Sequence, residues 1–139
     1  MRIMSVDHGK VRIGIAVSDE TGTIANPLTV LAHVSRLTDA AVVAGLAAEH
    51  QAGLIVVGQS FDESGRPSLA GRSAARFADA LKTQTGLPVV LWDEAFTTRD
   101  ARSARIELGV SRRKRAGHLD DLAAVVLLQA YLDGRKQAR

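Results

Sequence analysis

The chain has no cysteine and few aromatic residues, and each shortage excludes a class of structure or chemistry. Without cysteine, neither a disulfide framework nor a thiolate metal site can form. Because aromatic residues make up only 4% of the sequence, the core must be built from valine, isoleucine, leucine and alanine. For the same reason, stacking on bases is a poor candidate for the recognition of nucleic acid.

Long hydrophobic segments are missing as well. The first residues, Met-Arg-Ile-Met-Ser-Val-Asp, contain no apolar signal-peptide core. The longest wholly apolar run in the last third, Leu122 to Leu128, is far too short to span a bilayer. We therefore expect a soluble cytoplasmic protein without a membrane partner. The length of 139 residues predicts one domain over residues 1–139, with residues 134–139 as a flexible basic tail.

Charge is nearly balanced overall but uneven along the chain. The sequence has 18 lysines and arginines against 15 acidic residues, a formal net charge of +3. Many of the basic residues lie in the last third: Arg99, Arg102, Arg105, Arg112, Arg113, Lys114, Arg115, Arg135, Lys136 and Arg139. Such a cluster favours a polyanionic partner such as nucleic acid. A merely solubilising surface or a frayed tail is the alternative.

Hydrophobic periodicity and turn residues predict an alternation of strands and helices. Residues 2–19 form two strands joined by a tight turn, and a third strand over 23–31 contains Pro27, which indicates a sheet edge or a bulge. The elements predicted after these strands are a helix over 38–50, a buried strand over 54–58, a polar and mobile loop over 60–68, a helix over 69–85, a buried strand over 87–92, a helix over 97–108, a basic loop over 109–118 and a helix over 119–132.

This order predicts an α/β fold. The first three strands can pair antiparallel through short turns, whereas the later strands are separated by helices and must pair parallel. We expect a mixed five-stranded sheet with helices on both faces.

Acidic residues stand at three element boundaries. Asp7 ends the first strand, Asp93-Glu94 ends the last strand, and Asp120-Asp121 opens the final helix. Parallel strands bring their carboxyl ends to one edge of a sheet, so Asp7 and Glu94 can converge there, and a helix across the sheet can add Asp120. Clustered carboxylates repel one another unless a cation such as Mg²⁺ or Mn²⁺ neutralises them. Turn formation and helix capping are the alternatives, and spacing alone does not separate Asp120 from Asp121.

Four segments together resemble the YqgF family of Holliday-junction-resolvase-like proteins, which have a ribonuclease H-like fold. They occur in the order typical of the family and cover nearly the whole chain: residues 7–19, 55–58, 93–98, and 119–124 with 131–133. The resemblance implies a metal-dependent nuclease that matures the small-subunit ribosomal RNA precursor or, by analogy, cleaves Holliday junctions. It assigns the acidic triad to Asp7, Glu94 and Asp120. Ala95 replaces a usual basic residue, and Gln59-Ser60 replaces a usual proline.

The predicted reaction is phosphodiester hydrolysis with one or two Mg²⁺ or Mn²⁺ ions, for which Asp7, Glu94 and Asp120 are the catalytic and metal-binding residues. The expected partners are precursor rRNA, small-subunit precursors or branched DNA, bound by a monomer or a homodimer. His8 and His118 flank two of the acids and are either proton shuttles or surface residues. The residues expected to contact nucleic acid are Lys10, Arg12, Arg112, Arg113, Lys114 and Arg115.

Two other functions fit parts of the sequence. Asp7, Gly9 and Gly14 resemble the phosphate loop of actin-like sugar kinases and ATPases. Those proteins bind ATP between two such domains, and this chain is long enough for one. A non-catalytic nucleic-acid-binding factor in ribosome assembly is the second alternative, and Ala95 is the residue that keeps it open.

Overall fold

The computed structural model describes residues 1–95 and 120–137 of the chain. Five strands form one mixed sheet in the order β3-β2-β1-β4-β5. β1 pairs antiparallel with β2, and β2 pairs antiparallel with β3. β4 pairs parallel with both β1 and β5, which confirms the predicted topology. The strands are β1 (Arg2–His8), β2 (Arg12–Ser18), β3 (Ala25–Ala32), β4 (Ala52–Gln59) and β5 (Val89–Asp93).

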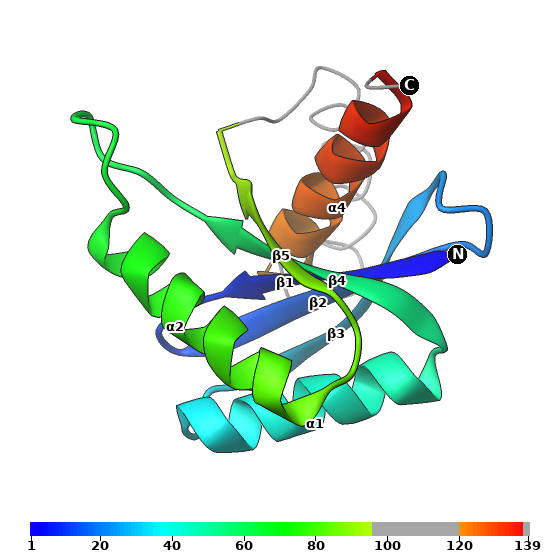
Figure 1. Ribbon diagram of the computed structural model, residues 1–139, viewed down its shortest axis with the longest axis horizontal. Helices are drawn as coiled ribbons and strands as arrows, with labels where there is room; N and C mark the ends of the chain where they lie inside the picture. Colours follow the sequence, from blue (N-terminus) through cyan, green and yellow to red (C-terminus); the bar gives the residue numbers. More distant parts are fainter. Residues whose placement is uncertain (96–119, 138–139) are drawn as a thin grey trace, which may run out of the picture.

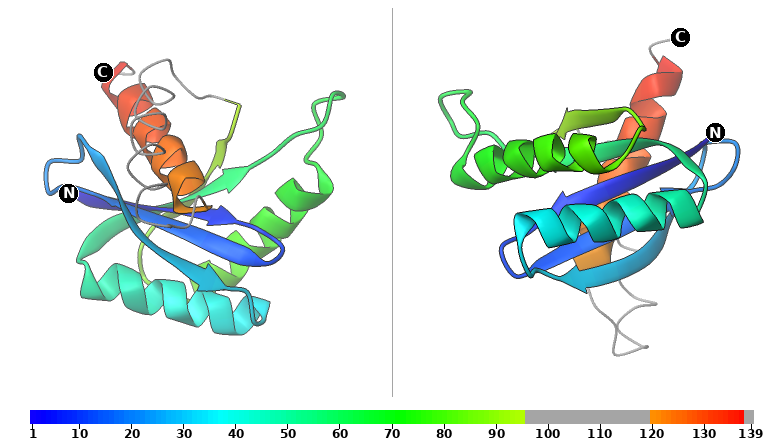
Figure 2. Two further views of the ribbon diagram at one scale, coloured as in Figure 1. Left: turned by 180° about the vertical axis from the view of Figure 1, so that it is seen from behind. Right: turned by 60° about the horizontal axis from the view of Figure 1, so that its bottom comes forward.

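Helices cover both faces of this sheet, as the sequence predicts (Figures 1 and 2). α1 (Arg36–Glu49) and α2 (Leu69–Gln84) lie together on one face, and α4 (Asp120–Gln137) lies across the other. The predicted helix over 97–108 and the basic loop over 109–118 lie outside the described residues. Within the ranges that the structure describes, no helix is both long and apolar enough to cross a bilayer.

The alternation of side chains along β1 builds two separate cores. Met4 and Val6 are fully buried on the side of α1 and α2, where they pack in one cluster with Phe77. Ile3 is buried on the side of α4. Ser5 points to the same side, and its hydroxyl donates a 2.7 Å hydrogen bond to the carbonyl of Ala124. This bond fixes the amino-terminal half of α4 over β1.

The sheet has β3 at one edge and β5 at the other, and the sequence predicted the edge position for β3 alone. Pro27 lies in the edge strand β3, where the register shifts between Ile15 and Ala16 of β2, so the expected edge and bulge are both present. The last strand is less buried than predicted, because β5 forms the opposite edge and Leu91 is 41% exposed. An apolar run does not by itself distinguish a central strand from an edge strand.

The carboxyl end of α4 corrects the predicted basic tail. The helix continues to Gln137, so residues 134–137 are helical instead of part of a flexible tail. The ring of Trp92 explains the extension, because it packs within 3.2 Å of the position that a Cβ on Gly134 would take. Trp92 also packs edge to face with Tyr131 at 5.2 Å, and Arg135 lies over that tyrosine ring. Packing against the sheet therefore outweighs the polar composition of this segment.

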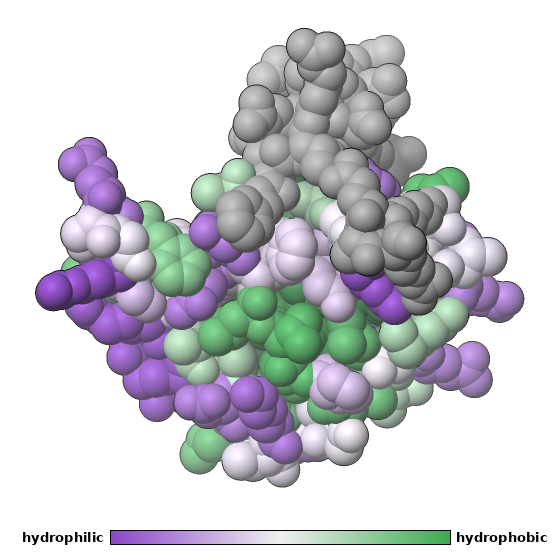
Figure 3. All heavy atoms as spheres, turned by 45° about the horizontal axis from the view of Figure 1, so that its top comes forward, coloured by the Kyte–Doolittle hydropathy of each residue, from purple (hydrophilic) through white to green (hydrophobic). Residues whose placement is uncertain are grey.

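The connection between β4 and α2 also differs from its prediction as a mobile loop. Phe61 and Pro67 form an isolated β-bridge, and the Asp62 carboxylate accepts hydrogen bonds from the N–H groups of Ser64 and Arg66. The connection is therefore a hydrogen-bonded hairpin that projects beside α2 (Figure 1). Its surface and that of α2 are largely hydrophilic (Figure 3).

Candidate active site

The candidate site lies where the three parallel strands end on the α4 side of the sheet. Asp7 follows Ser5 on β1 with the spacing of two residues that keeps both on this face. Val6 pairs with Val57, so Gly58 of β4 lies beside Asp7. Gly58 in turn pairs with Trp92 of β5, and Glu94 follows two residues later. Asp7, Gly58 and Glu94 thus come from neighbouring strands and share one face.

The glycine at the centre of this group makes room for a carboxylate. A Cβ atom on Gly58 would lie 2.9 Å from Oε1 of Glu94 and 3.0 Å from Cδ2 of Leu127. The Glu94 side chain therefore crosses the end of β4 in the space that any other residue would fill. The backbone N–H of Glu94 donates a 3.0 Å hydrogen bond to the carbonyl of Gln59, which fixes the turn after β5. Gly58 is not among the predicted site residues, although a glycine ending the apolar run Ile-Val-Val is a signal of close approach.

The two adjacent acids after β5 have different roles. Asp93 Oδ1 accepts a 2.8 Å hydrogen bond from the N–H of Ala95 and so closes the turn. Glu94 points to the other side, over Gly58. The structure therefore brings Glu94, and not Asp93, together with Asp7.

The electrostatics of Glu94 reflect this crowding. Partial burial raises the pKa of the Glu94 carboxyl above its ordinary value, and the negative charges of Asp7 and Asp93 raise it further. Neighbouring carboxylates and loss of solvent both penalise the ionised form. A cation among these oxygens would remove the penalty, and carboxylate oxygens are the ligands that Mg²⁺ and Mn²⁺ prefer. The residues present therefore fit a divalent cation.

The third predicted acid is placed through its backbone only. Asp120 is the first residue of α4, one helical turn before Ala124, which Ser5 holds against β1. The side chains of Asp120 and Asp121 lie outside the part of the chain that the structure describes. Among the described side chains, no group of three histidines or acids forms a complete metal site.

Of the residues expected to bind nucleic acid, Lys10 and Arg12 are described, and both are exposed, Lys10 in the turn after β1 and Arg12 at the start of β2. This turn is tight because the N–H of Gly9 donates to the carbonyl of Arg12, and a Cβ on Gly9 would lie 2.5 Å from that oxygen. Lys10 and Arg12 therefore lie at the same edge as Asp7. The predicted contacts Arg112, Arg113, Lys114 and Arg115 lie outside the described residues, as does His118.

His8 follows Asp7 directly but lies on the opposite face of the sheet. Its ring stacks on Phe77 of α2 with 4.7 Å between centroids. Of the two alternatives for His8, a proton shuttle for the acids is therefore not supported, because successive residues of a strand point to opposite faces.

Solved structures with this arrangement of strands and helices include proteins that cut DNA junctions. A T. thermophilus RuvC structure in complex with a Holliday junction substrate is 17% identical, has a TM-score of 0.63, and the match covers 98% of this chain and 96% of that one. The fowlpox virus Holliday junction resolvase is 15% identical with a TM-score of 0.57, and the match covers 96% and 99% of the two chains. The fold is therefore of the ribonuclease H-like class, as the sequence predicts.

The chain belongs to the RuvX family, described as Holliday junction resolvase, which it matches over residues 1–134. A relative from Thermoanaerobacter pseudethanolicus is 40% identical, and the match covers 98% of this chain and 99% of the relative. A relative from Syntrophus aciditrophicus is 37% identical over 100% of this chain and 93% of its own length. Both carry the name "Putative pre-16S rRNA nuclease". The resemblance seen in the sequence is thereby confirmed.

Proposed function

We propose that this chain hydrolyses phosphodiester bonds of structured nucleic acid in the cytoplasm and that its substrate is the precursor of 16S rRNA. The observation that carries this proposal is that the Glu94 carboxylate lies over Gly58, at the carboxyl edge of the sheet, and is electrostatically coupled to Asp7 on the neighbouring strand. The family and the names of its relatives support the reaction class and the substrate. The carboxylates themselves support metal-assisted chemistry.

Asp7, Glu94 and Asp120 are the residues that would hold Mg²⁺ or Mn²⁺, with Asp7 as the central ligand. Such an ion supplies Lewis acidity at the phosphoryl oxygen and acidifies the attacking water. Asp7 is held by the ladders of β1 with both β2 and β4, and Glu94 by its backbone bond to Gln59. Both carboxylates are therefore set in position by backbone structure before any substrate arrives.

The charged turn after β1 is the proposed contact for the substrate backbone. Lys10 and Arg12 are exposed at the edge where Asp7 ends its strand. Four basic residues near the end of the chain are proposed to extend this contact, and the basis for including them is their positive charge: Arg112, Arg113, Lys114 and Arg115. Because such contacts release counterions from nucleic acid, affinity should fall steeply as salt rises.

Cleavage assays of a precursor 16S rRNA fragment with the wild type and Asp7→Asn test the proposal. The wild type should cut the RNA in the presence of Mn²⁺. It should be inactive when EDTA removes the metal. Asp7→Asn should lose at least about 10³-fold in rate, since a metal ligand supports several kcal/mol of transition-state stabilisation. Asp79→Asn is the matched control, because Asp79 is exposed on α2, away from this site. Undiminished cleavage by a folded Asp7→Asn protein would overturn the mechanism.

A second substrate is favoured by the family description and by the RuvC-like fold. A four-way DNA junction included in the same assay compares it directly with the RNA. Preferential cleavage of the junction would reassign the substrate and keep the chemistry. Binding of either nucleic acid without cleavage in Mg²⁺ or Mn²⁺ would favour the non-catalytic assembly factor.

A further inference from the structure

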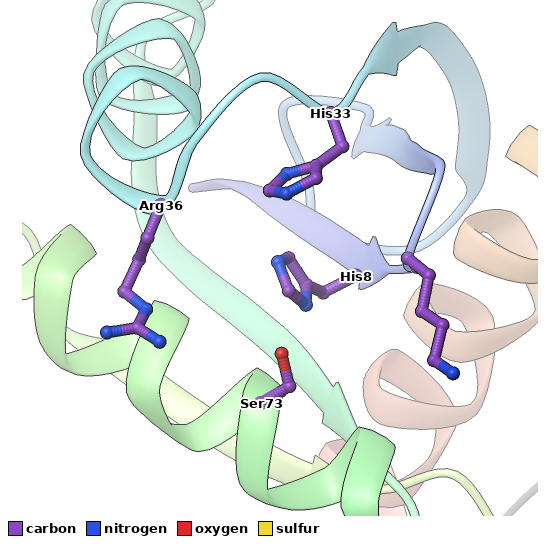
Figure 4. Close-up of a pocket in the computed structure, with 6 residues that line it drawn as sticks. His8, His33, Arg36 and Ser73 are labelled. Atoms are coloured by element: carbon purple, nitrogen blue, oxygen red, sulfur yellow. The ribbon is translucent and has the colours of Figure 1, made fainter.

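A second polar pocket lies on the opposite face of the sheet from Asp7 and Glu94. Its volume is about 270 Å³. It opens where the ends of β1 and β3 meet the first turns of α1 and α2 (Figure 4). The residues that line it are His8, Gly9, Lys10, His33, Arg36 and Ser73.

One wall of this pocket is a histidine held by a buried acid. Asp39 of α1 is 3% exposed. Its carboxylate lies 2.5 Å from Nδ1 of His33 and accepts a 3.1 Å hydrogen bond from the N–H of Val34. Because Nδ1 of His33 faces Asp39, its Nε2 is left on the far side of the ring. Burying a carboxylate without hydrogen-bond partners would cost free energy. The contact between Asp39 and Nδ1 of His33 avoids that cost and at the same time fixes the orientation of the imidazole ring.

The other walls are equally well defined. His8 stacks on Phe77 and packs edge to face with His33, with 6.3 Å between the two imidazole centroids. Figure 4 shows both imidazole rings and the Ser73 hydroxyl facing the same space. The Arg36 side chain extends from the start of α1 toward α2 beside them. Side chains from β1, the segment after β3, α1 and α2 thus converge on one volume.

The lining of this pocket carries positive charge and hydrogen-bond donors. Lys10 and Arg36 are cations, the imidazoles and the Ser73 hydroxyl can donate, and none of the lining residues is acidic. The nearby carboxylate, Asp39, is turned toward His33 and Val34. Donors and cations that converge without a carboxylate among them suit an anion with oxygen atoms pointing in several directions.

We propose that this pocket binds a phosphate group. The tetrahedral oxygens of phosphate can accept hydrogen bonds from several directions, and Arg36, the two imidazoles and Ser73 supply donors from different walls of this pocket. The pocket is larger than one phosphate and leaves space for an attached sugar. Either a free phosphate or the backbone of a nucleic acid can supply the group.

The position of the pocket favours the nucleic-acid backbone as the source, and that assignment rests on the proposed function. His8 and Asp7 are consecutive at the end of β1, and Lys10 lies in the turn that follows. A strand of nucleic acid that crosses this edge of the sheet passes the carboxylates on one face and the pocket on the other. The pocket would then hold a phosphate away from the bond that is cut.

Imidazole resonances followed by NMR during titration provide the test, with the Asp7→Asn protein in EDTA so that no cleavage intervenes. Inorganic phosphate is one probe, and a short oligonucleotide without terminal phosphates is the other, each against chloride of equal ionic strength. Resonances of His8 and His33 should shift with saturation, and that of His50 on the opposite end of α1 should not. Arg36→Gln should weaken binding by at least about tenfold, whereas Arg66→Gln, on the exposed hairpin, should leave it unchanged.

Saturation by the oligonucleotide identifies a backbone phosphate, and saturation by inorganic phosphate alone identifies a free phosphate site. The proposal is overturned when neither probe moves His8 and His33 more than His50, or when Arg36→Gln binds as the wild type does. Because the measurement uses a cleavage-deficient variant, its failure leaves the proposed nuclease reaction untouched. Loss of cleavage in that variant likewise says nothing against the pocket.

Discussion

The two faces of the sheet carry opposite chemistry at the same end of β1. On the α4 face, the negative charge of Glu94 lies over Gly58 and close enough to Asp7 for the two carboxylates to repel each other. On the face of α1 and α2, His8 packs with His33 in a pocket that Lys10 and Arg36 also line. Two consecutive residues, Asp7 and His8, thus belong to different sites. Neighbours in a strand therefore share a position along the sheet but not an environment.

Both sites hold like charges close together, and in each the cost appears as a shifted pKa. The Glu94 pKa is raised by burial and by neighbouring acids. The pKa of His8 is lowered by burial first and then by its electrostatic interaction with His33, although Asp39 opposes the shift. Each site is therefore suited to a ligand of the opposite charge, a cation on one face and an anion on the other.

The largest effect that separates the two faces is expected from Gly58→Ala. The added methyl would displace Glu94 or Leu127, so cleavage should fall by about 10²-fold and stability by about 1–3 kcal/mol. Phosphate binding at the opposite pocket should be unchanged. Kinetics and denaturant melts measure both quantities.

Gly45→Ala is the matched control for that substitution. No atom lies within 4 Å of a Cβ at Gly45 of α1, so alanine should stabilise the helix by about 0.5–1 kcal/mol and leave cleavage intact. Equal losses of cleavage in the two variants would show that the space over Gly58 has no special role.

A smaller effect is predicted for Glu94→Gln, which should stabilise the folded chain although it removes a residue of the candidate site. Because the folded-state pKa of Glu94 lies above its ordinary 4.5, its contribution to stability is present below pH 4.5 and is lost as pH rises through the folded value. Removing the charge should therefore raise the melting temperature in EDTA at neutral pH, and the rise should be small because solvent screens the repulsion at this exposed residue. The stabilisation that Mn²⁺ gives the wild type should disappear in this variant.

Thermal melts at several pH values, with Glu63→Gln as an exposed control, measure the Glu94 effect. A lower melting temperature for Glu94→Gln in EDTA would mean that the carboxylate is stabilised in the folded chain, contrary to the electrostatics described above.

The smallest expected effect is the contribution of His8, on the face of α1 and α2, to folding stability. Its dependence on pH is opposite to that of Glu94. The folded-state pKa of His8 lies below its ordinary 6.5. The unfolded chain then binds the proton more readily, so stability falls as pH drops from 6.5 toward the lower folded value. Partial exposure limits this term to a few tenths of a kcal/mol.

Melts of His8→Gln and the wild type between neutral and mildly acidic pH measure this term. His8→Gln should lose the fall in stability that His8 causes at mildly acidic pH. His50→Gln should retain it, because His50 lies away from the pocket. Parallel curves for His8→Gln and the wild type would show that His8 is not destabilised when charged.

Much of the fold could be predicted from local sequence patterns. Alternating apolar residues predicted the strands, and Pro27 predicted an edge or a bulge, because these signals depend on neighbouring residues alone. The end of α4 and the hairpin over 60–68 were not predicted. Their order comes from Trp92 packing against Gly134 and from the Phe61–Pro67 bridge. Composition favoured a polar tail and a mobile loop in both places, since it contains no information about distant partners.

The candidate acids could be identified from sequence, but their arrangement could not. The ends of strands and helices indicated Asp7, Glu94 and Asp120, and the family resemblance selected among adjacent acids. The structure gave a physical reason for Glu94 over Asp93, because Asp93 closes the turn with Ala95. Gly58 escaped notice, since a missing side chain has meaning only where another group fills its space.

The sequence by itself determined an α/β chain without cysteine chemistry, the order of its strands and helices, and the acids at their ends. These follow from backbone propensity, apolar periodicity and residue type, all of which act locally. Tertiary structure alone decided which residues meet. It sent Asp7 to the α4 face and His8 to the other, set Glu94 in the space above Gly58, and joined His8, His33, Arg36 and Ser73 in one pocket. Such meetings depend on the pleat and on long-range packing, which a linear pattern does not contain.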